Sequence, residues 1–185
     1  LKVGSPLGRG EVFQLTRGAA RLEIAGAEVL VQGPAEVSVI GDHTLFVRQG
    51  KVTVAHDGEL AVQTPVAIVT GEGGKYAVAA EGETEVNVTA VDGSASVHSL
   101  PHRGQFGISL GNVAAGSSLR VTNLGSRRLR VDANASPPDG LLLAWEDTAA
   151  KLHPYERLVL SDGPLAYWPL YRVRRHRAVL DLTQH

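Results

Sequence analysis

The alternation of apolar and polar residues in short segments separated by glycine is the feature that most constrains this fold. Apolar side chains recur at every second position in segments such as 28–31, 36–39, 51–54 and 85–89. A strand points successive side chains to opposite faces, so this period buries one face and leaves the other in water. Turns spaced at roughly 8–12 residues favour a sandwich, barrel or solenoid. We therefore predict an all-β fold, either a β-solenoid-like stack or a twisted β-sandwich of short strands, with a small irregular or helical C-terminal extension.

Two glycines at turns carry a more specific expectation. Gly33 and Gly50 each stand between alternating segments. Because glycine has no Cβ, it is the usual residue where the backbone needs a positive φ. We expect a positive φ at both positions.

Composition divides the chain into three parts. Residues 1–133 hold the alternating segments and predict one β domain, and residues 134–140 read Asn-Ala-Ser-Pro-Pro-Asp-Gly, which predicts a linker. Residues 141–185 form a C-terminal extension, with one more strand predicted at 141–145 and a short helix at 154–160 that begins with proline. The extension is too short to fold alone and holds five of the nine aromatic residues. We expect it to pack on the β core or on a partner.

Bulk properties exclude several classes of protein. The 185 residues carry a formal net charge of −1, so there is no basic field to attract nucleic acid. The longest apolar run is far below the roughly 18 residues that span a bilayer, which predicts no membrane-spanning segment. The absence of cysteine excludes disulfides and cysteine nucleophiles. The chain begins with Leu1 and has no methionine, which we interpret as a processed or trimmed piece of a longer precursor, as removal of a signal peptide would leave.

Motifs for catalysis are missing from the sequence. It contains no Gly-x-Ser-x-Gly elbow, and the Gly-Glu-Gly-Gly stretch at 71–74 lacks the Lys-Ser/Thr of a phosphate loop. His98 and His102 form the only close histidine pair, but Pro101 disfavours the helix that would align them. We interpret both as solvated loop histidines rather than metal ligands.

Acidic residues beside glycine turns are the remaining metal candidates. Ca²⁺ needs six to eight oxygen ligands, several from clustered carboxylates, and none of these turns has two clustered acids. Asp-Gly turns are explained more simply as hairpin turns. We predict no metal, no cofactor and no catalytic residue, and therefore no enzyme. The four acidic residues weighed here as Ca²⁺ ligands are Asp42, Asp57, Glu72 and Asp92.

The C-terminal extension mixes aromatic and basic side chains between residues 167 and 177. Such a mixture can stack on nucleic acid, bind an acidic polysaccharide or dock on a partner protein. The near-neutral total charge favours a solvated or partner-docked tail. The candidate interaction residues are Tyr167, Trp168, Tyr171, Arg172, Arg174, Arg175 and Arg177.

The order of turns and strands carries a family resemblance. The ordered series comprises Gly-Ala-Ala-Arg-Leu-Glu at 18–23, Gly-Ala-Glu-Val-Leu-Val-Gln-Gly-Pro-Ala-Glu at 26–36, Val-Gln-Thr-Pro at 62–65 and Gly-Lys-Tyr-Ala-Val at 74–78. Over about residues 12–125 it resembles the FecR family of bacterial cell-envelope proteins, particularly the planctomycete type. The chain departs from the family where Tyr76 stands for a phenylalanine and a nearby threonine is missing.

This resemblance implies a function outside the cytoplasm. In that family the domain lies on the outer side of the cytoplasmic membrane and relays a signal to a sigma or anti-sigma partner, or it serves as a surface module joined to carbohydrate-binding domains. It implies a non-catalytic extracytoplasmic module, periplasmic, surface-bound or secreted, that acts in protein–protein recognition at the cell envelope. Residues 155–170 resemble the start of a LamG/concanavalin A-like domain, which implies carbohydrate contact through a further downstream domain.

A second function stays open at this point. Short strands leave edges that invite strand addition from a neighbour. The chain could therefore be a structural subunit of an extracellular filament or surface assembly, held to identical subunits by strand edges and its C-terminal tail.

Overall fold

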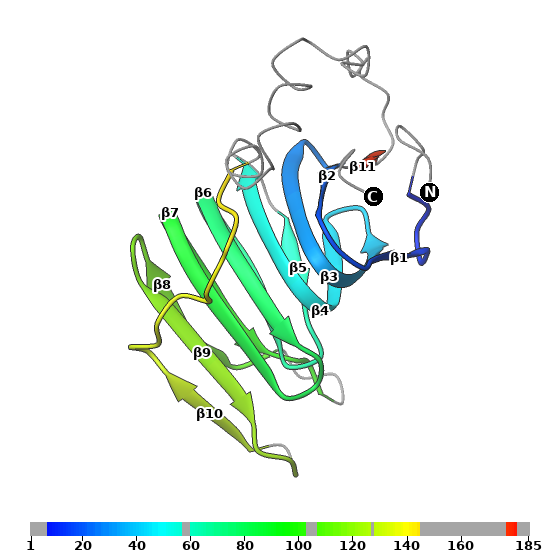
Figure 1. Cartoon of the computed structure of the whole chain (residues 1–185). Coiled ribbons are helices and arrows are strands. Elements are labelled where there is room, and N and C mark those ends of the chain that lie inside the picture. The colour runs from blue at the N-terminus through cyan, green and yellow to red at the C-terminus, as the bar shows by residue number, and fades with distance from the viewer. Residues whose placement is uncertain (1–6, 57–59, 103–106, 127, 145–176, 181–185) are drawn as a thin grey trace.

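The computed structural model describes residues 7–56, 60–102, 107–126, 128–144 and 177–180, and these residues form an all-β structure (Figure 1). Eleven strands join in one hydrogen-bonded sheet, and the described residues include no helix. The predicted all-β class is confirmed. The strands are β1 (Val12–Leu15), β2 (Ala19–Ile24), β3 (Ala27–Gly41), β4 (Thr44–His56), β5 (Ala61–Gln63), β6 (Ala67–Glu81), β7 (Glu85–Ser99), β8 (Ser109–Ala114), β9 (Ser118–Asn123), β10 (Leu129–Asp132) and β11 (Arg177–Leu180).

Four long strands, β3, β4, β6 and β7, each pair with different neighbours in their two halves. One set of halves joins β2, β9 and β10, and we call this half-sheet I; it contains residues 27–32, 50–56, 74–81 and 85–92 of the long strands. The other halves join β1, β5 and β8 as half-sheet II. Register shifts between the paired strands mark the change from one half to the other.

The apolar faces of the two half-sheets share one core. Val29 and Val52 from half-sheet I and Val37 and Val47 from half-sheet II are all at most 1 % exposed and belong to the same cluster. Strands that switch between packed layers at bends are typical of β-sandwiches. The sheet therefore folds back on its own apolar side, which buries the apolar residues of the alternating pattern.

Gly50 lies at one of these bends and has a φ of 110°. A Cβ placed there would lie 2.5 Å from the Ala35 Cβ and 2.8 Å from the Pro34 carbonyl oxygen. The expected positive φ is confirmed at Gly50. It is wrong at Gly33, which is not among the positive-φ residues; a Cβ at Gly33 would instead lie 3.0 Å from the backbone of Arg17.

Tyr76 is the largest fully buried side chain among the described residues, at 1 % exposure. Its hydroxyl donates a hydrogen bond of 2.7 Å to the Leu60 carbonyl oxygen, and its ring lies where a Cβ of Gly71 would otherwise be. The core therefore satisfies the one polar atom by which tyrosine differs from phenylalanine. Burial raises the pKa of Tyr76 well above its ordinary value, because the charged phenolate would lose its hydration.

Two predicted C-terminal elements have different outcomes. The strand expected at 141–145 is wrong for Leu141–Ala144, which form no strand. Their backbone is held by side chains of the sheet rather than by a neighbouring strand. The helix expected at 154–160 lies outside the described residues. None of the described segments is a helix of the length and apolarity that crossing a membrane requires.

Replacing Gly50 by valine tests the bend between the half-sheets. We expect Gly50→Val to lower the free energy of unfolding by about 2–4 kcal/mol, because it adds backbone strain and a clash with Ala35. Chemical denaturation measures this loss. Gly26→Val is the matched control, since Gly26 also has a positive φ of 81° but a Cβ added there would meet no atom within 4 Å. Equal losses in the two variants would show that close packing at the bend is unimportant.

Removing the Tyr76 hydroxyl tests the buried hydrogen bond. We expect Tyr76→Phe to lower the free energy of unfolding by about 1 kcal/mol at neutral pH, because the Leu60 carbonyl loses this donor. Urea denaturation at pH 7 measures the difference.

The same pair of proteins predicts a pH dependence. A tyrosine whose pKa is raised in the folded state stabilises the fold below the unfolded pKa of about 10, and that contribution is lost as pH rises further. The stability advantage of the parent over Tyr76→Phe should therefore shrink above about pH 10. A gap that stays constant or widens with alkaline pH would contradict burial of a neutral phenol.

Candidate functional site

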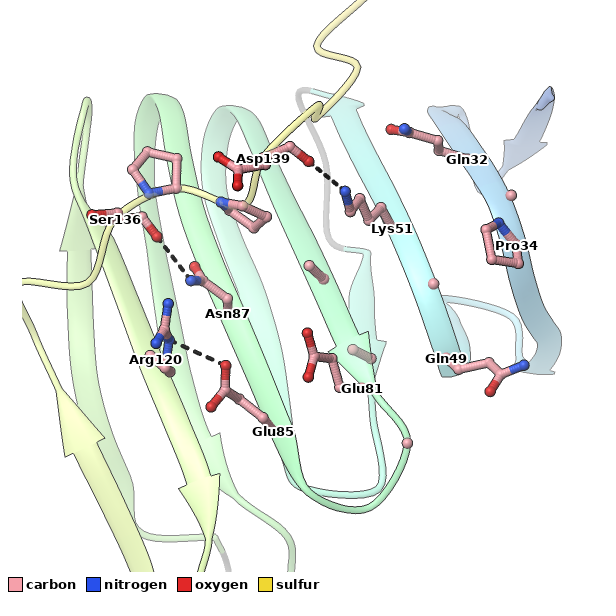
Figure 2. Close-up of a pocket in the computed structure, with 17 residues that line it drawn as sticks. Gln32, Pro34, Gln49, Lys51, Glu81, Glu85, Asn87, Arg120, Ser136 and Asp139 are labelled. Atoms are coloured by element: carbon pink, nitrogen blue, oxygen red, sulfur yellow. Dashed lines mark hydrogen bonds and ion pairs between the residues drawn. The ribbon is translucent and has the colours of Figure 1, made fainter. Parts of the chain in front are cut away.

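A row of side chains crosses the outer face of half-sheet I, on the side away from the core. Strand pairing places five residues in line, because each is the register partner of the next on the neighbouring strand. Side chains at paired positions point to the same face of a sheet. Four of the five are polar, so the row can make directed hydrogen bonds. In order from β3 through β4, β6 and β7 to β9 it comprises Gln32, Lys51, Ala79, Asn87 and Arg120 (Figure 2).

Residues 136–144 run over this row, and we call this segment the strap. Asn87 donates a side-chain hydrogen bond of 3.0 Å to the carbonyl oxygen of Ser136. Lys51 donates its ammonium group to the carbonyl oxygen of Asp139. Both contacts are drawn in Figure 2, where the strap passes from the β7 side toward β3. The sheet thus binds main-chain atoms of the strap at two separate points.

The end of the strap is held in the same way. Gln32 donates to the Gly140 carbonyl oxygen at 2.9 Å and accepts from the Leu142 amide at 3.1 Å. Thr53 donates its hydroxyl to the Leu142 carbonyl oxygen at 2.6 Å. Five hydrogen bonds therefore join sheet side chains to strap main chain. Recognition of this kind depends on an extended backbone rather than on particular side chains.

One apolar side chain supplements these polar contacts. Leu142 is 5 % exposed and forms a small buried cluster with Ala19 and Leu30 on the outer face. Burying one leucine contributes roughly 1.5–3 kcal/mol. Leu142 is therefore the apolar anchor that fixes the strap's position along the face.

A groove of about 690 Å³ lies on the same face beside the strap (Figure 2). Its floor is formed by small residues, and the strap's two prolines contribute to its lining. Polar side chains from β3, β4, β6, β7 and β9 line the rest, and no aromatic residue is among the described residues that line it. The lining residues include Gln49, Gly50, Ala79, Glu81, Gly82, Glu85, Asn87, Arg120, Pro137 and Pro138.

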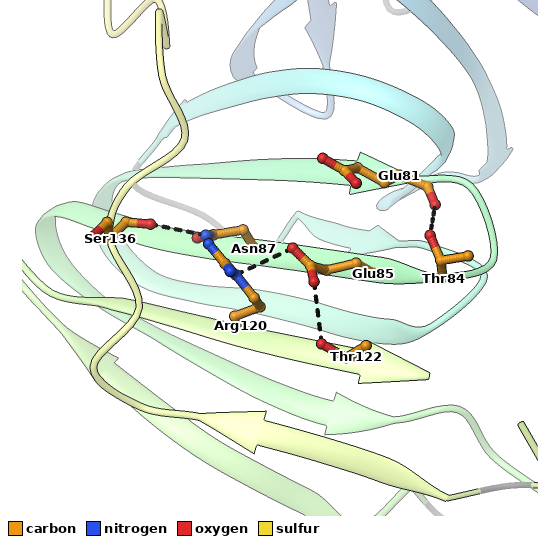
Figure 3. A network of polar contacts seen from close by, with 7 residues as sticks. All are labelled: Glu81, Thr84, Glu85, Asn87, Arg120, Thr122 and Ser136. Atoms are coloured by element: carbon orange, nitrogen blue, oxygen red, sulfur yellow. Dashed lines mark hydrogen bonds and ion pairs between the residues drawn. The ribbon is translucent and has the colours of Figure 1, made fainter. Parts of the chain in front are cut away.

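Glu85 organises the polar contacts at one end of the groove (Figure 3). Its carboxylate lies 3.1 Å from the Nε of Arg120 and accepts a hydrogen bond of 3.2 Å from the Thr122 hydroxyl. The Arg120 side chain is 40 % exposed, so water weakens this ion pair and its contribution to stability is small. Its structural effect is to orient both side chains.

Asn87 has an unused acceptor in this groove. The residue is 5 % exposed, and its Oδ1 atom has no hydrogen-bond partner among the residues that the structure describes. Its Nδ2 atom is already directed at Ser136. Buried polar atoms are normally satisfied, so a buried acceptor at the wall of a groove is a candidate ligand contact.

The predicted interaction residues lie elsewhere. Arg177 is the first residue of β11 and pairs with Glu23 of β2, at the opposite edge of the sheet from β10. The structure therefore does not bring Arg177 to the groove. The other six predicted residues, Tyr167, Trp168, Tyr171, Arg172, Arg174 and Arg175, lie outside the described residues.

One of the metal candidates, Glu72, has a structural role between two strands. Glu72 accepts hydrogen bonds of 3.0 Å from both Ser94 and Ser96 across the pair β6–β7. His98 lies within β7 and not in a loop, because the strand continues to Ser99. Asp57 lies outside the described residues. Across the described ranges, no three His, Cys, Asp or Glu side chains gather at one point.

Comparison with known proteins identifies similar structures but no family. No protein-family model matches the sequence, and the search of curated proteins found no match. A crystal structure at 1.65 Å of a candidate anti-sigma factor from Parabacteroides distasonis ATCC 8503 has 15 % identity and a TM-score of 0.49, over 66 % of this chain and 59 % of that one. Another from the same organism, at 2.50 Å, has 17 % identity and a TM-score of 0.43, over 72 % and 61 %.

These similarities are distant. This chain spans about three fifths of the length of both neighbours, and both TM-scores are below 0.5. They carry no argument about function, and the FecR resemblance stays a prediction.

Exchanging Gln32 for glutamate tests how the strap is held. We expect Gln32→Glu to speed hydrogen exchange of the Leu142 amide by about tenfold, because a carboxylate cannot donate to Gly140 and repels its carbonyl oxygen. Core amides of β4 and β6 should exchange as in the parent. Gln49→Glu is the control, since Gln49 is exposed and lines the groove, while the five strap hydrogen bonds come from other side chains. Unchanged exchange at Leu142 would contradict the proposed anchoring.

Proposed function

We propose that this chain is a non-catalytic, extracytoplasmic module of the bacterial cell envelope that recognises another protein. One observation carries the proposal: the outer face of half-sheet I binds a nine-residue segment mainly through its main chain. A face with this chemistry is suited to extended polypeptide of varied sequence.

The groove supports recognition rather than catalysis. Glu85 and Arg120 pair with each other and are partly exposed, with side-chain exposures of 26 % and 40 %. A solvated ion pair whose two charges satisfy each other is typical of a structural or binding contact. The absence of an aromatic platform among the described lining residues also makes the groove a poor carbohydrate site.

The proposed location and partner class rest on the resemblance to the FecR family. That resemblance supports a place outside the cytoplasm and a partner in envelope signalling, of the sigma or anti-sigma regulatory kind. The structural contribution is a face that can hold such a partner's chain.

The filament alternative has less support from the two edges of half-sheet I. β10 is only four residues long and carries Arg130 and Asp132, and short charged edges discourage strand addition. The edge of β2 is paired with β11 of the same chain. At these two edges of half-sheet I, strand addition between identical subunits is therefore not favoured.

Site-specific photocrosslinking in the source bacterium tests the proposal. A photoreactive residue at Gln49, in the groove, and one at Val131, on exposed β10, sample two separate surfaces of the full chain. We expect a discrete crosslink to a different protein in the envelope fraction, identified by mass spectrometry. Crosslinks only between copies of this chain would favour the structural alternative, and crosslinks only in the cytoplasmic fraction would contradict the proposed location.

A further inference from the structure

The groove beside the strap has the dimensions of a second extended segment. It crosses the strands from β3 to β9, with Pro34 and Arg120 among its lining residues at the two ends of this path. Adjacent strands lie about 4.8 Å apart, so four spacings, β3–β4–β6–β7–β9, cover about 19 Å. An extended chain rises about 3.3 Å per residue, which gives a segment of about six residues.

The floor of the groove leaves room for a main chain to approach closely. Gly50, Ala79 and Gly82 place at most a methyl group there, and a Cβ at Gly82 would meet no atom within 4 Å. Pro137 and Pro138 of the strap also line the groove and have no backbone N–H to offer. A segment lying there would therefore contact small residues below it. The adjacent prolines of the strap cannot pair with it as a strand, because they have no N–H groups.

Two polar groups at the groove that lack a partner among the described residues define the chemistry of the segment. The buried Oδ1 of Asn87 needs a donor, which a backbone N–H supplies. The exposed carboxylate of Glu81 forms no salt bridge with any described residue, whereas that of Glu85 is paired with Arg120. An unpaired carboxylate at the groove margin complements a lysine or arginine side chain.

We propose that this groove binds an extended segment of a partner protein, about six residues long, which donates a backbone N–H to Asn87 and places a basic side chain beside Glu81. The inference rests on the proposed recognition function and names the site and the chemistry of its ligand. The strap is a precedent for this binding mode, because side chains of the same face already hold it by its main-chain atoms.

Synthetic hexapeptides test the site directly. The probes are acetylated and amidated Ala-Val-Lys-Val-Ala-Ser and the same peptide with norleucine in place of lysine, titrated into the full ¹⁵N-labelled chain. We expect the lysine peptide to shift the side-chain amide signals of Asn87 and Gln49. The norleucine peptide should bind about fivefold more weakly, as expected for one exposed ion pair.

Three variants locate the binding. Ala79→Trp fills the groove from its floor, where Ala79 is 9 % exposed, and should weaken binding of the lysine peptide at least tenfold. Arg130→Trp, on the outer face of β10 and away from the groove, is the matched control and should bind as the parent does. Glu81→Gln should remove the preference for lysine over norleucine while the norleucine peptide binds as before.

The outcomes separate this inference from the recognition function. Absence of shifts at Asn87, or binding that survives in Ala79→Trp, overturns the groove site. If crosslinks to an envelope protein still form from Val131 in that case, recognition stands and uses another surface. If a peptide of residues 172–177, with sequence Arg-Val-Arg-Arg-His-Arg, shifts Asn87 and the hexapeptides do not, the occupant is the basic tail of a second copy and the partner-protein assignment is wrong.

Discussion

The rest of the structure depends on the bends that let four long strands serve two half-sheets around one core. Each strand must turn its apolar side inward on both sides of the bend, because Val29 and Val37 of β3 lie in the same buried cluster. The bend brings backbone from neighbouring strands into contact, and at Gly50 there is no room for a side chain beside Ala35. Glycine at this position is therefore a requirement of the fold and not only of a local turn.

The same register that builds the core also builds the candidate site. Val31 and Val52 face inward as register partners, so their neighbours Gln32 and Lys51 face outward together. A slip of one residue between two strands would turn a polar member of the row into the core and bury its polar group without a partner. The outer-face row is thus specified by the burial of valines on the opposite face. A site of this kind needs no separate folding signal.

Much of the fold follows from the sequence, but the site does not. Period-2 alternation predicts the strands and the all-β class, because burial on one face is a local property. The prediction for Leu141–Ala144 is wrong because their apolar run resembles a strand, whereas Gln32 and Thr53, about 90–110 positions earlier in the chain, take up the backbone groups of Leu142. In the sequence, Asn87 is one of many polar residues that face away from the core. Only pairing between distant strands places it in the row with Lys51 and Arg120. Pairing between distant strands is what a single sequence does not display.

The chemistry of the strap limits how Asn87 can be paired. Pro137 and Pro138 have no N–H groups, so the two strap residues that follow Ser136 offer carbonyl oxygens and no main-chain donors. The sheet accordingly directs donors at it, from Asn87 to Ser136 and from Lys51 to Asp139. An asparagine that uses its N–H group in this way must direct its carbonyl elsewhere, because the amide is planar and carries both groups. Neither proline can pair with the Oδ1 of Asn87, which is left without a partner among the described residues and can accept a donor such as a backbone N–H.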